Sequence, residues 1–300
     1  MTARTATVAS PSVASRGRLF AYFELTKPRV VAMVLVTTLA GYYLAAAGGL
    51  DLGLGFNLLV GTALAAAGTL ALNQYSERAT DAMMLRTQHR PLPDGRLSPG
   101  EALVFGLITT GAGLSYLALS TNWACTGITA SIALIYLLAY TPLKRVTWAC
   151  DIVGAIPGAL PPVAGWVAAR GTVTGQPLVM FAMMFLWQLP HTFAVARLYR
   201  EDYRRAAIKL LPEDGRWGNP SDIVVIVASC ALIAVGIAPT LMGSAGLLYL
   251  AVAVLLGLVL LGCGIAMVRA PGQPQRARRL LFASLVYLPV VLLIMVVDRI

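Results

Sequence analysis

The chain has 300 residues, of which 58% are hydrophobic and 12% are charged, and its mean hydropathy is +0.76. This composition excludes a soluble globular domain and indicates an integral membrane protein. The formal net charge of +10 does not indicate a nucleic-acid-binding protein, because the basic residues fall in separate loops between apolar segments.

Apolar runs long enough to cross about 30 Å of hydrocarbon recur along the chain and predict nine transmembrane helices. The expected spans are roughly 30–47, 54–75, 101–119, 124–141, 152–169, 178–199, 222–241, 246–268 and 280–297. The connections are too short for a separate soluble domain. We therefore expect an all-α bundle of nine transmembrane helices, formed by residues 25–300, with residues 1–24 as a flexible cytoplasmic tail.

The positions of the basic residues predict the orientation of the bundle. If the N-terminus lies inside, all of the 23 Lys and Arg residues except Arg170 and Arg299 fall on the inner side. Lys and Arg concentrate in cytoplasmic loops of membrane proteins. We therefore expect the N-terminus inside and the C-terminus outside, with the net charge mainly a consequence of this topology.

The second expected span runs into a polar segment that carries the main functional prediction. Asn73, Glu77 and Asp81 recur at every fourth position, so on a helix they form one stripe that turns only about 80° around the axis. Arg86 and Arg90 follow shortly afterwards. Carboxylates beside guanidinium groups suit a divalent cation bound together with phosphate.

Two later segments extend this pattern. Lys144 and Arg145 return to the inner side after the fourth span. The fifth span must be kinked, and either borders a binding chamber or simply packs closely against its neighbours. Its helix-breaking and small residues are Gly154, Pro157, Gly158, Pro161, Pro162 and Gly165.

The sixth span, residues 178–199, runs in the same direction as the second and leads to Glu201 and Asp202. Two helix ends therefore bring carboxylates to the same membrane depth, where like charges need cations between them. His191 lies within this span. It is either a histidine hydrogen-bonded inside the bundle or a ligand to a metal-porphyrin or a proton-transfer group.

Simpler interpretations remain for the individual acids. Glu77 and Asp81 are also consistent with salt bridges to Arg78 or Arg86, and Glu201 with Asp202 is consistent with a solvated loop face. The convergence of the two acidic clusters favours a magnesium and diphosphate site instead.

Several motifs follow one another along the chain. They are Asn73-x-x-x-Glu77-x-x-x-Asp81, Arg86-Thr87-x-x-Arg90-Pro91-Leu92, Tyr140-Thr141-Pro142-Leu143-Lys144-Arg145, Gly154-Ala155-Ile156-Pro157-Gly158, Trp187-Gln188-Leu189-Pro190-His191 and Asp202-Tyr203. Together they resemble the signature of the UbiA-type intramembrane prenyltransferases over nearly the whole chain from Leu25. The Arg-Thr-x-x-Arg-Pro-Leu portion resembles the heme O synthase (protoheme IX farnesyltransferase) branch of that family.

The resemblance implies transfer of the farnesyl group of farnesyl diphosphate to the vinyl group of heme b, with Mg²⁺ as cofactor and heme O as product. It implies these site residues: Asn73, Glu77, Asp81 and Asp202 as catalytic, with Mg²⁺ on Glu77, Asp81 and Asp202; Arg86, Arg90, Lys144 and Arg145 on the diphosphate; and His191 as a heme ligand or proton relay. The expected partners are the two substrates, membrane lipids, and heme A synthase or a terminal oxidase pathway. The expected location is the bacterial inner membrane, with the active site on the cytoplasmic side.

Glu77 stands where much of the superfamily has Asp, and the chain also departs from the family pattern at Ala79, Cys150, Thr192 and Ala207. Three other functions therefore remain open. They are prenylation of another acceptor such as a hydroxybenzoate or a chlorophyll precursor, transport of a cation, and a non-catalytic role in assembling a respiratory complex.

Overall fold

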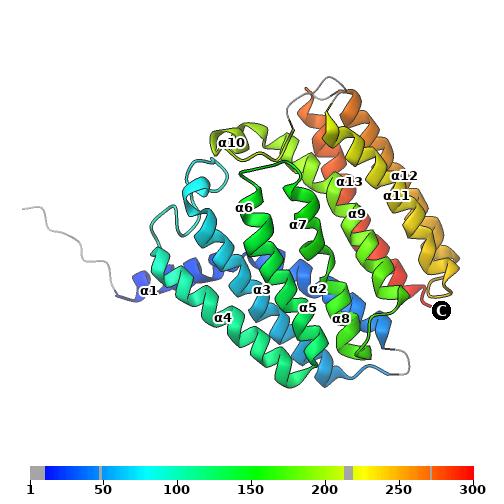
Figure 1. Cartoon of the computed structure of the whole chain (residues 1–300), viewed down its shortest axis with the longest axis horizontal. Helices are drawn as coiled ribbons and strands as arrows, with labels where there is room; N and C mark the ends of the chain where they lie inside the picture. Colours follow the sequence, from blue (N-terminus) through cyan, green and yellow to red (C-terminus); the bar gives the residue numbers. More distant parts are fainter. Residues whose placement is uncertain (1–10, 47–48, 213–218, 271) are drawn as a thin grey trace, which may run out of the picture.

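The computed structural model describes residues 11–46, 49–212, 219–270 and 272–300, and this part of the chain contains helices and no strand (Figure 1). The helices are α1 (Pro11–Leu25), α2 (Pro28–Ala45), α3 (Leu52–Asp81), α4 (Pro99–Ser120), α5 (Trp123–Leu134), the π-helix η1 (Ile135–Tyr140), α6 (Thr141–Leu143), α7 (Cys150–Ala159), α8 (Pro161–Arg170), α9 (Gly175–Leu198), α10 (Arg200–Arg205), α11 (Pro220–Leu241), α12 (Leu247–Arg269) and α13 (Pro274–Val297).

Nine stretches of the described chain are long and apolar enough to cross a membrane, which confirms the predicted number of spans. The segments α5, η1 and α6 form one span, and α7 with α8 form another. The last span is longer than predicted: α13 begins at Pro274, so Arg276, Arg278 and Arg279 lie in its first turns and not in a loop. The hydropathy pattern detects only the apolar part of a helix, whereas a helix that extends beyond the hydrocarbon carries charges at its end.

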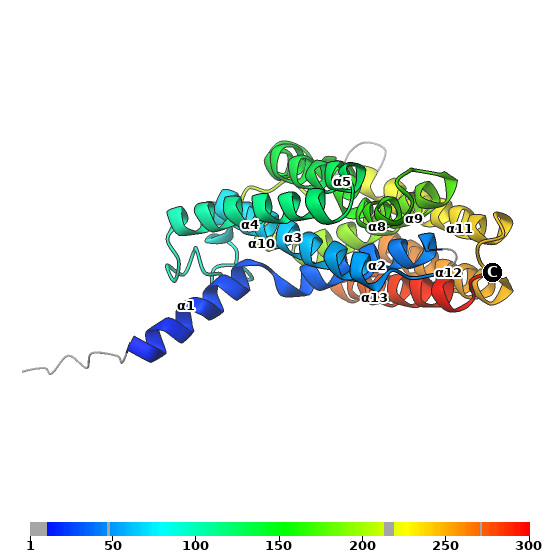
Figure 2. The ribbon, with the colours of Figure 1, turned by 90° about the horizontal axis from the view of Figure 1, so that it is seen from below.

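The N-terminal segment differs from the flexible tail expected over residues 1–24. From Pro11 onward it forms α1, which extends away from the bundle in Figure 2. Residues 1–10 lie outside the described part of the chain. Leu19, Phe20 and Phe23 on α1 are exposed apolar side chains.

Specific capping residues fix the start of α3, which carries the polar segment, and the start of α4, which follows it. Asp51 accepts a hydrogen bond from the Leu54 N–H at the start of α3 (2.9 Å). At the start of α4, Ser98 and Glu101 form a reciprocal capping box. Each cap satisfies backbone N–H groups that have no partner within their own helix.

The fifth span is broken, as its prolines predicted, at Leu160 between α7 and α8. It both packs closely and borders a chamber. A Cβ on Gly165 would lie 1.9 Å from the Thr38 carbonyl oxygen of α2, so glycine is required for this close approach. The same span also lines a cavity between α2, α3, α5, η1 and α9.

The C-terminal ends of α3 and α9 lie at the same end of the bundle, together with α10 (Figure 1). The ends of α2, α8 and α13 lie at the opposite end. A large apolar cluster joins α9 to α11, α12 and α13, with Tyr249 and Tyr287 buried at its centre. Helices α11, α12 and α13 therefore hold α9 in position by apolar packing.

Candidate functional site

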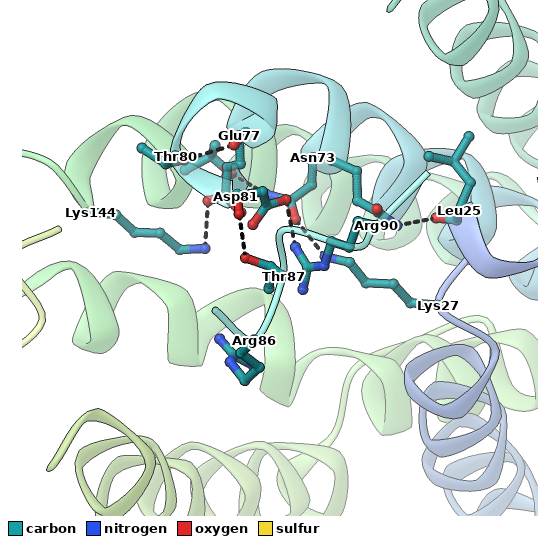
Figure 3. A network of polar contacts seen from close by, with 12 residues as sticks. Leu25, Lys27, Asn73, Glu77, Thr80, Asp81, Arg86, Thr87, Arg90 and Lys144 are labelled. Atoms are coloured by element: carbon teal, nitrogen blue, oxygen red, sulfur yellow. Dashed lines mark hydrogen bonds and ion pairs between the residues drawn. The ribbon is translucent and has the colours of Figure 1, made fainter. Parts of the chain in front are cut away.

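The polar stripe of α3 faces basic side chains from three other segments (Figure 3). Asn73 is completely buried at the start of the stripe. Its Oδ1 accepts a hydrogen bond from Lys27 Nζ (2.8 Å), and its Nδ2 donates to Thr141 Oγ1 (3.2 Å). Asn73 thus joins the turn before α2 to the start of α6.

The two carboxylates of the stripe each form an ion pair. Glu77 Oε1 lies 2.7 Å from Lys144 Nζ, and Asp81 Oδ2 lies 2.7 Å from a terminal nitrogen of Arg90. The Asp81 side chain is only 1% exposed, so its charge depends on this contact. The salt-bridge interpretation of the sequence named Arg78 or Arg86 as partners. The structure gives different ones, because the chain turns back after α3 to bring Arg90 to Asp81, and α6 brings Lys144 to Glu77.

Lys27 also belongs to the site, which the sequence did not indicate. It has a left-handed backbone conformation (φ 51°) directly before Pro28, and this turn between α1 and α2 directs its side chain inward. Burial, and then the nearby charge of Arg90, lower the pKa of Lys27 to about 7. The hydrogen-bond partner of the Lys27 ammonium group is the neutral Asn73 amide and not a carboxylate, so its proton is held weakly.

Lys144 behaves in the opposite way. Burial by itself lowers the pKa of Lys144, but Tyr140 and Glu77 more than offset that effect, and the pKa lies well above its usual value. Lys144 Nζ also lies 4.3 Å from the centre of the Tyr140 ring. It therefore stays charged at physiological pH.

Asp202 approaches the same region from α10. Its carboxylate oxygens lie 3.4 Å from the backbone nitrogens of Leu85 and Arg86, in the segment that follows α3. Its side chain is 13% exposed and also contacts Arg205 (3.5 Å). Asp202 therefore contacts the segment that directly follows α3, at the same end of the bundle.

Glu201 does not take part in this contact. Its side chain is 67% exposed and pairs with Arg204, one turn further along α10. The solvated-face interpretation therefore applies to Glu201, whereas Asp202 faces inward.

The basic residues of the sequence motifs divide into two groups. Arg90 and Lys144 contact the acidic stripe, as described above. Arg86 is exposed, points away from the stripe in Figure 3, and packs over the rings of Tyr199 and Tyr203. Arg145 is exposed and makes no ion pair with a residue that the structure describes.

No three His, Cys, Asp or Glu side chains lie close enough together to hold a metal ion in the described residues. Glu77, Asp81 and Asp202 are thus not gathered into one three-carboxylate centre. The chemistry of the donors nevertheless fits Mg²⁺, which prefers one or two carboxylates completed by water and phosphate oxygens. Asn73, Glu77 and Asp81 supply oxygen donors on one face of α3.

An apolar chamber of about 280 Å³ adjoins the polar cluster. The side chains of Tyr136 and Tyr140 form its boundary toward Lys144. The rest of the wall comes from Val30, Val34, Thr38, Thr62, Ala65, Ala66, Thr69, Leu70, Thr129, Ile132, Gly154, Pro157, Gly158, Pro161, Ala164 and Gln188.

The two tyrosines owe their positions to the π-helix η1. At the end of η1 the Thr141 backbone N–H donates to the Tyr136 carbonyl, five residues earlier, and the Thr141 hydroxyl donates to the same carbonyl (2.8 Å). The wider turn leaves the Tyr136 and Tyr140 rings 5.4 Å apart. Neither tyrosine was assigned a role from the sequence, although Tyr140 begins one of the motifs quoted above and Pro142 follows it.

His191 lies on another face of α9. Its Nδ1 shares a hydrogen bond with Ser284 Oγ of α13 (2.8 Å), and its ring stacks on Trp187 at 5.0 Å. Gln188, one residue after Trp187, instead lines the chamber. The structure thus shows the histidine hydrogen-bonded within the bundle, at the α9–α13 contact.

Asp151 is a further buried acid that sequence analysis did not select. It lies in the first turn of α7, is 3% exposed, and its Oδ2 has no hydrogen-bond partner in the described chain. The available signal was an acid at the start of an otherwise apolar span.

The chain is similar to known proteins of one family. The model of the UbiA prenyltransferase family matches residues 34–286. A protoheme IX farnesyltransferase of Solibacter usitatus is 43% identical over 287 residues, which cover 93% of this chain and 98% of the relative. One from Koribacter versatilis is 39% identical over 301 residues, covering 97% and 96%.

Solved structures show the same fold. A UbiA homolog from Aeropyrum pernix K1 superimposes with a TM-score of 0.68 at 18% identity, covering 90% of this chain and 97% of that one. A UbiA homolog from Archaeoglobus fulgidus, bound to GPP and Mg²⁺, gives a TM-score of 0.66 at 16% identity, covering 92% and 99%.

Proposed function

The chain belongs to the UbiA prenyltransferase family, and we propose that it transfers the farnesyl group of farnesyl diphosphate to the vinyl group of heme b, making heme O. The acceptor is inferred from relatives named protoheme IX farnesyltransferase that match almost the whole chain. The observation that carries the proposal is the chamber wall at Tyr136 and Tyr140, which places an apolar cavity directly beside a cluster of paired acids and bases.

The polar cluster is suited to a diphosphate. Each polar side chain of the α3 stripe has one oxygen in contact with a basic side chain, from Lys27, Arg90 or Lys144. A diphosphate brings oxygens that compete for these three cations, and charge-assisted hydrogen bonds to phosphate are strong. We propose that Arg86 and Arg145 contact it from the outer side, where both are exposed.

The oxygens released by the cations can then hold a metal. We propose that Glu77, Asp81 and Asp202 hold Mg²⁺, with Asn73 beside them, directly or through water. When bound, Mg²⁺ neutralises charge on the diphosphate. The Archaeoglobus fulgidus homolog bound to GPP and Mg²⁺ supports this pairing of metal and prenyl diphosphate in the family fold.

The residues of the chain act on the departure of the diphosphate. Arg90 and Lys144 stabilise the negative charge that grows on its oxygens as the carbon–oxygen bond breaks. The rings of Tyr136 and Tyr140 face the allylic cation that is left, and aromatic faces attract cations. The apolar wall keeps water away from that cation until the acceptor has reacted.

The new carbon–carbon bond forms between the allylic carbon and the terminal vinyl carbon of heme. Water then adds to the positive charge left on the second vinyl carbon and releases a proton, which gives a hydroxyethylfarnesyl group. We propose that His191 binds the heme iron or relays this proton. Ser284 occupies its Nδ1, which leaves Nε2 for that role.

We place the protein in the bacterial inner membrane with the acidic end of the bundle on the cytoplasmic side. The support is the distribution of Lys and Arg, with only Arg170 and Arg299 at the opposite end. Association with heme A synthase or a terminal oxidase pathway is part of the same proposal, because heme O is consumed by later steps of heme modification.

The proposal is tested by incubating membranes that contain the protein with heme b, Mg²⁺ and farnesyl diphosphate, and searching for farnesylated heme by mass spectrometry. The wild type should form it, and Glu77→Gln and Asp81→Asn should not. Glu201→Gln, at an exposed acid outside the cluster, is the matched control and should remain active. Product from hydroxybenzoate and none from heme would overturn the assigned acceptor.

A further inference from the structure

A second pocket lies at the end of the bundle opposite the acidic stripe and has a volume of about 200 Å³. It lies where α2, α8, α11 and α13 end and α9 begins. None of the residues that line it belongs to the proposed catalytic cluster or to the apolar chamber. The pocket is therefore a separate feature of the fold.

Both basic residues assigned to this end of the bundle line this pocket. Arg170 donates from Nε to the Ala45 carbonyl (2.7 Å). Arg299 donates to the carbonyls of Tyr43 (3.0 Å) and Ala46 (3.5 Å). Neither arginine forms an ion pair with an acid in the described residues. Two positive charges thus line one cavity, and neither is in an ion pair within the described residues.

Capping the C-terminal end of α2 explains part of this arrangement. The carbonyls at a helix C-terminus carry partial negative charge, and arginine side chains bind them. A guanidinium group has several N–H donors, however, and the contacts to α2 use only the Nε of Arg170 and one terminal nitrogen of Arg299. Donors therefore remain on both side chains.

Trp166 provides an independent indication of a ligand. This side chain lines the pocket and is only 4% exposed. Its indole N–H is buried and has no hydrogen-bond partner in the part of the chain that the structure describes. A buried polar group without a partner costs free energy. The indole N–H without a partner and the two arginines without an acid partner thus belong to residues around one pocket, and an anion would supply acceptors for them.

The remaining wall determines the kind of anion. Val179, Met180 and Met295 line the pocket with apolar side chains. The ends of transmembrane helices lie at the depth of lipid headgroups, where arginine meets phosphate. We infer that this pocket binds one anionic phospholipid, with its phosphate on Arg170, Arg299 and Trp166 and part of an acyl chain along the apolar wall.

The inference is tested by native mass spectrometry of the purified full-length protein titrated with dioleoylphosphatidylglycerol. One lipid should bind tightly per chain. Arg170→Gln and Arg299→Gln should each weaken that binding about tenfold, since each loses a charged hydrogen bond. Trp166→Phe keeps the ring, removes only the N–H, and should weaken binding several-fold. Trp123→Phe, at an exposed tryptophan near the same end, should bind as the wild type does.

Two further arms identify the ligand. Dioleoylphosphatidylcholine carries the same phosphate with no net charge and should bind about tenfold more weakly. Inorganic phosphate lacks the acyl chains and should not displace the bound lipid at equal concentration. The inference is refuted if Arg170→Gln, Arg299→Gln and Trp166→Phe all bind the lipid as tightly as the wild type does. It is also refuted if inorganic phosphate displaces the bound lipid. Each variant's thermal unfolding, compared with the wild type, shows whether a loss of lipid reflects the site or the fold.

Discussion

The pair of Glu77 and Lys144 allows stability and catalysis to be separated. Their charged atoms are 2.7 Å apart, and both side chains are 14% exposed. At an effective dielectric constant of about 20, two unit charges at this distance attract by about 6 kcal/mol, and desolvation offsets part of that. Removing one partner leaves a largely buried charge and costs about 3–5 kcal/mol. We expect Lys144→Met to lose stability by this amount.

The double variant Lys144→Met with Glu77→Gln removes both charges. It should recover most of the lost stability, because no buried charge is left without a partner. It should not recover activity, because both the cation that stabilises the departing diphosphate and an acid proposed to hold Mg²⁺ are gone. Loss of one such stabilising group lowers kcat by about 10²–10³.

The measurements are apparent Tm in detergent and the rate of heme O formation in membranes. Lys144→Met should lower the apparent Tm by about 5–10 °C. The double variant should unfold close to the wild type and form no heme O. A double variant as unstable as Lys144→Met would refute this account, because the instability would then not come from the unpaired charge of Glu77. The account is also refuted if the double variant regains activity.

Three other outcomes are expected. Because the pKa of Lys27 is lowered to about 7, Lys27 should take up a proton and regain its charge when a diphosphate binds at pH 8. Calorimetry in two buffers should show this proton uptake for the wild type and not for Lys27→Arg, and the affinity for diphosphate should fall as pH rises above 7. Gly165→Ala would place a methyl group 1.9 Å from the Thr38 carbonyl and should cost about 1–3 kcal/mol, visible as a lower apparent Tm. Asp151→Leu removes a buried carboxylate whose Oδ2 has no partner and should raise the apparent Tm, whereas an unchanged or lower Tm would show that the acid is paired in the membrane.

Local sequence patterns were sufficient for much of the architecture. Span length depends on hydrocarbon thickness, so nine apolar runs predicted nine spans. The break at Leu160 followed from the prolines after it, because proline cannot donate the backbone hydrogen bond. Asn73, Glu77 and Asp81 share one face because helical periodicity places every fourth residue together.

The partners across the site could not be obtained in this way. Glu77 pairs with a lysine 67 positions away and Asp81 with an arginine nine positions away, and neither distance is encoded in a local pattern. Lys27 reaches the site because of a left-handed turn before Pro28, which no local pattern indicates. Tyr136 and Tyr140 became part of the chamber only through the π-helix.

The sequence by itself determined that this protein is a helical membrane bundle with acids at two helix ends, because hydrophobic length and helical period act within one segment. Only the tertiary structure decided which cations meet those acids, and that Arg170 and Arg299 share a pocket with Trp166. Such contacts depend on how segments far apart in the chain turn and pack, and packing is set by all of the helices together.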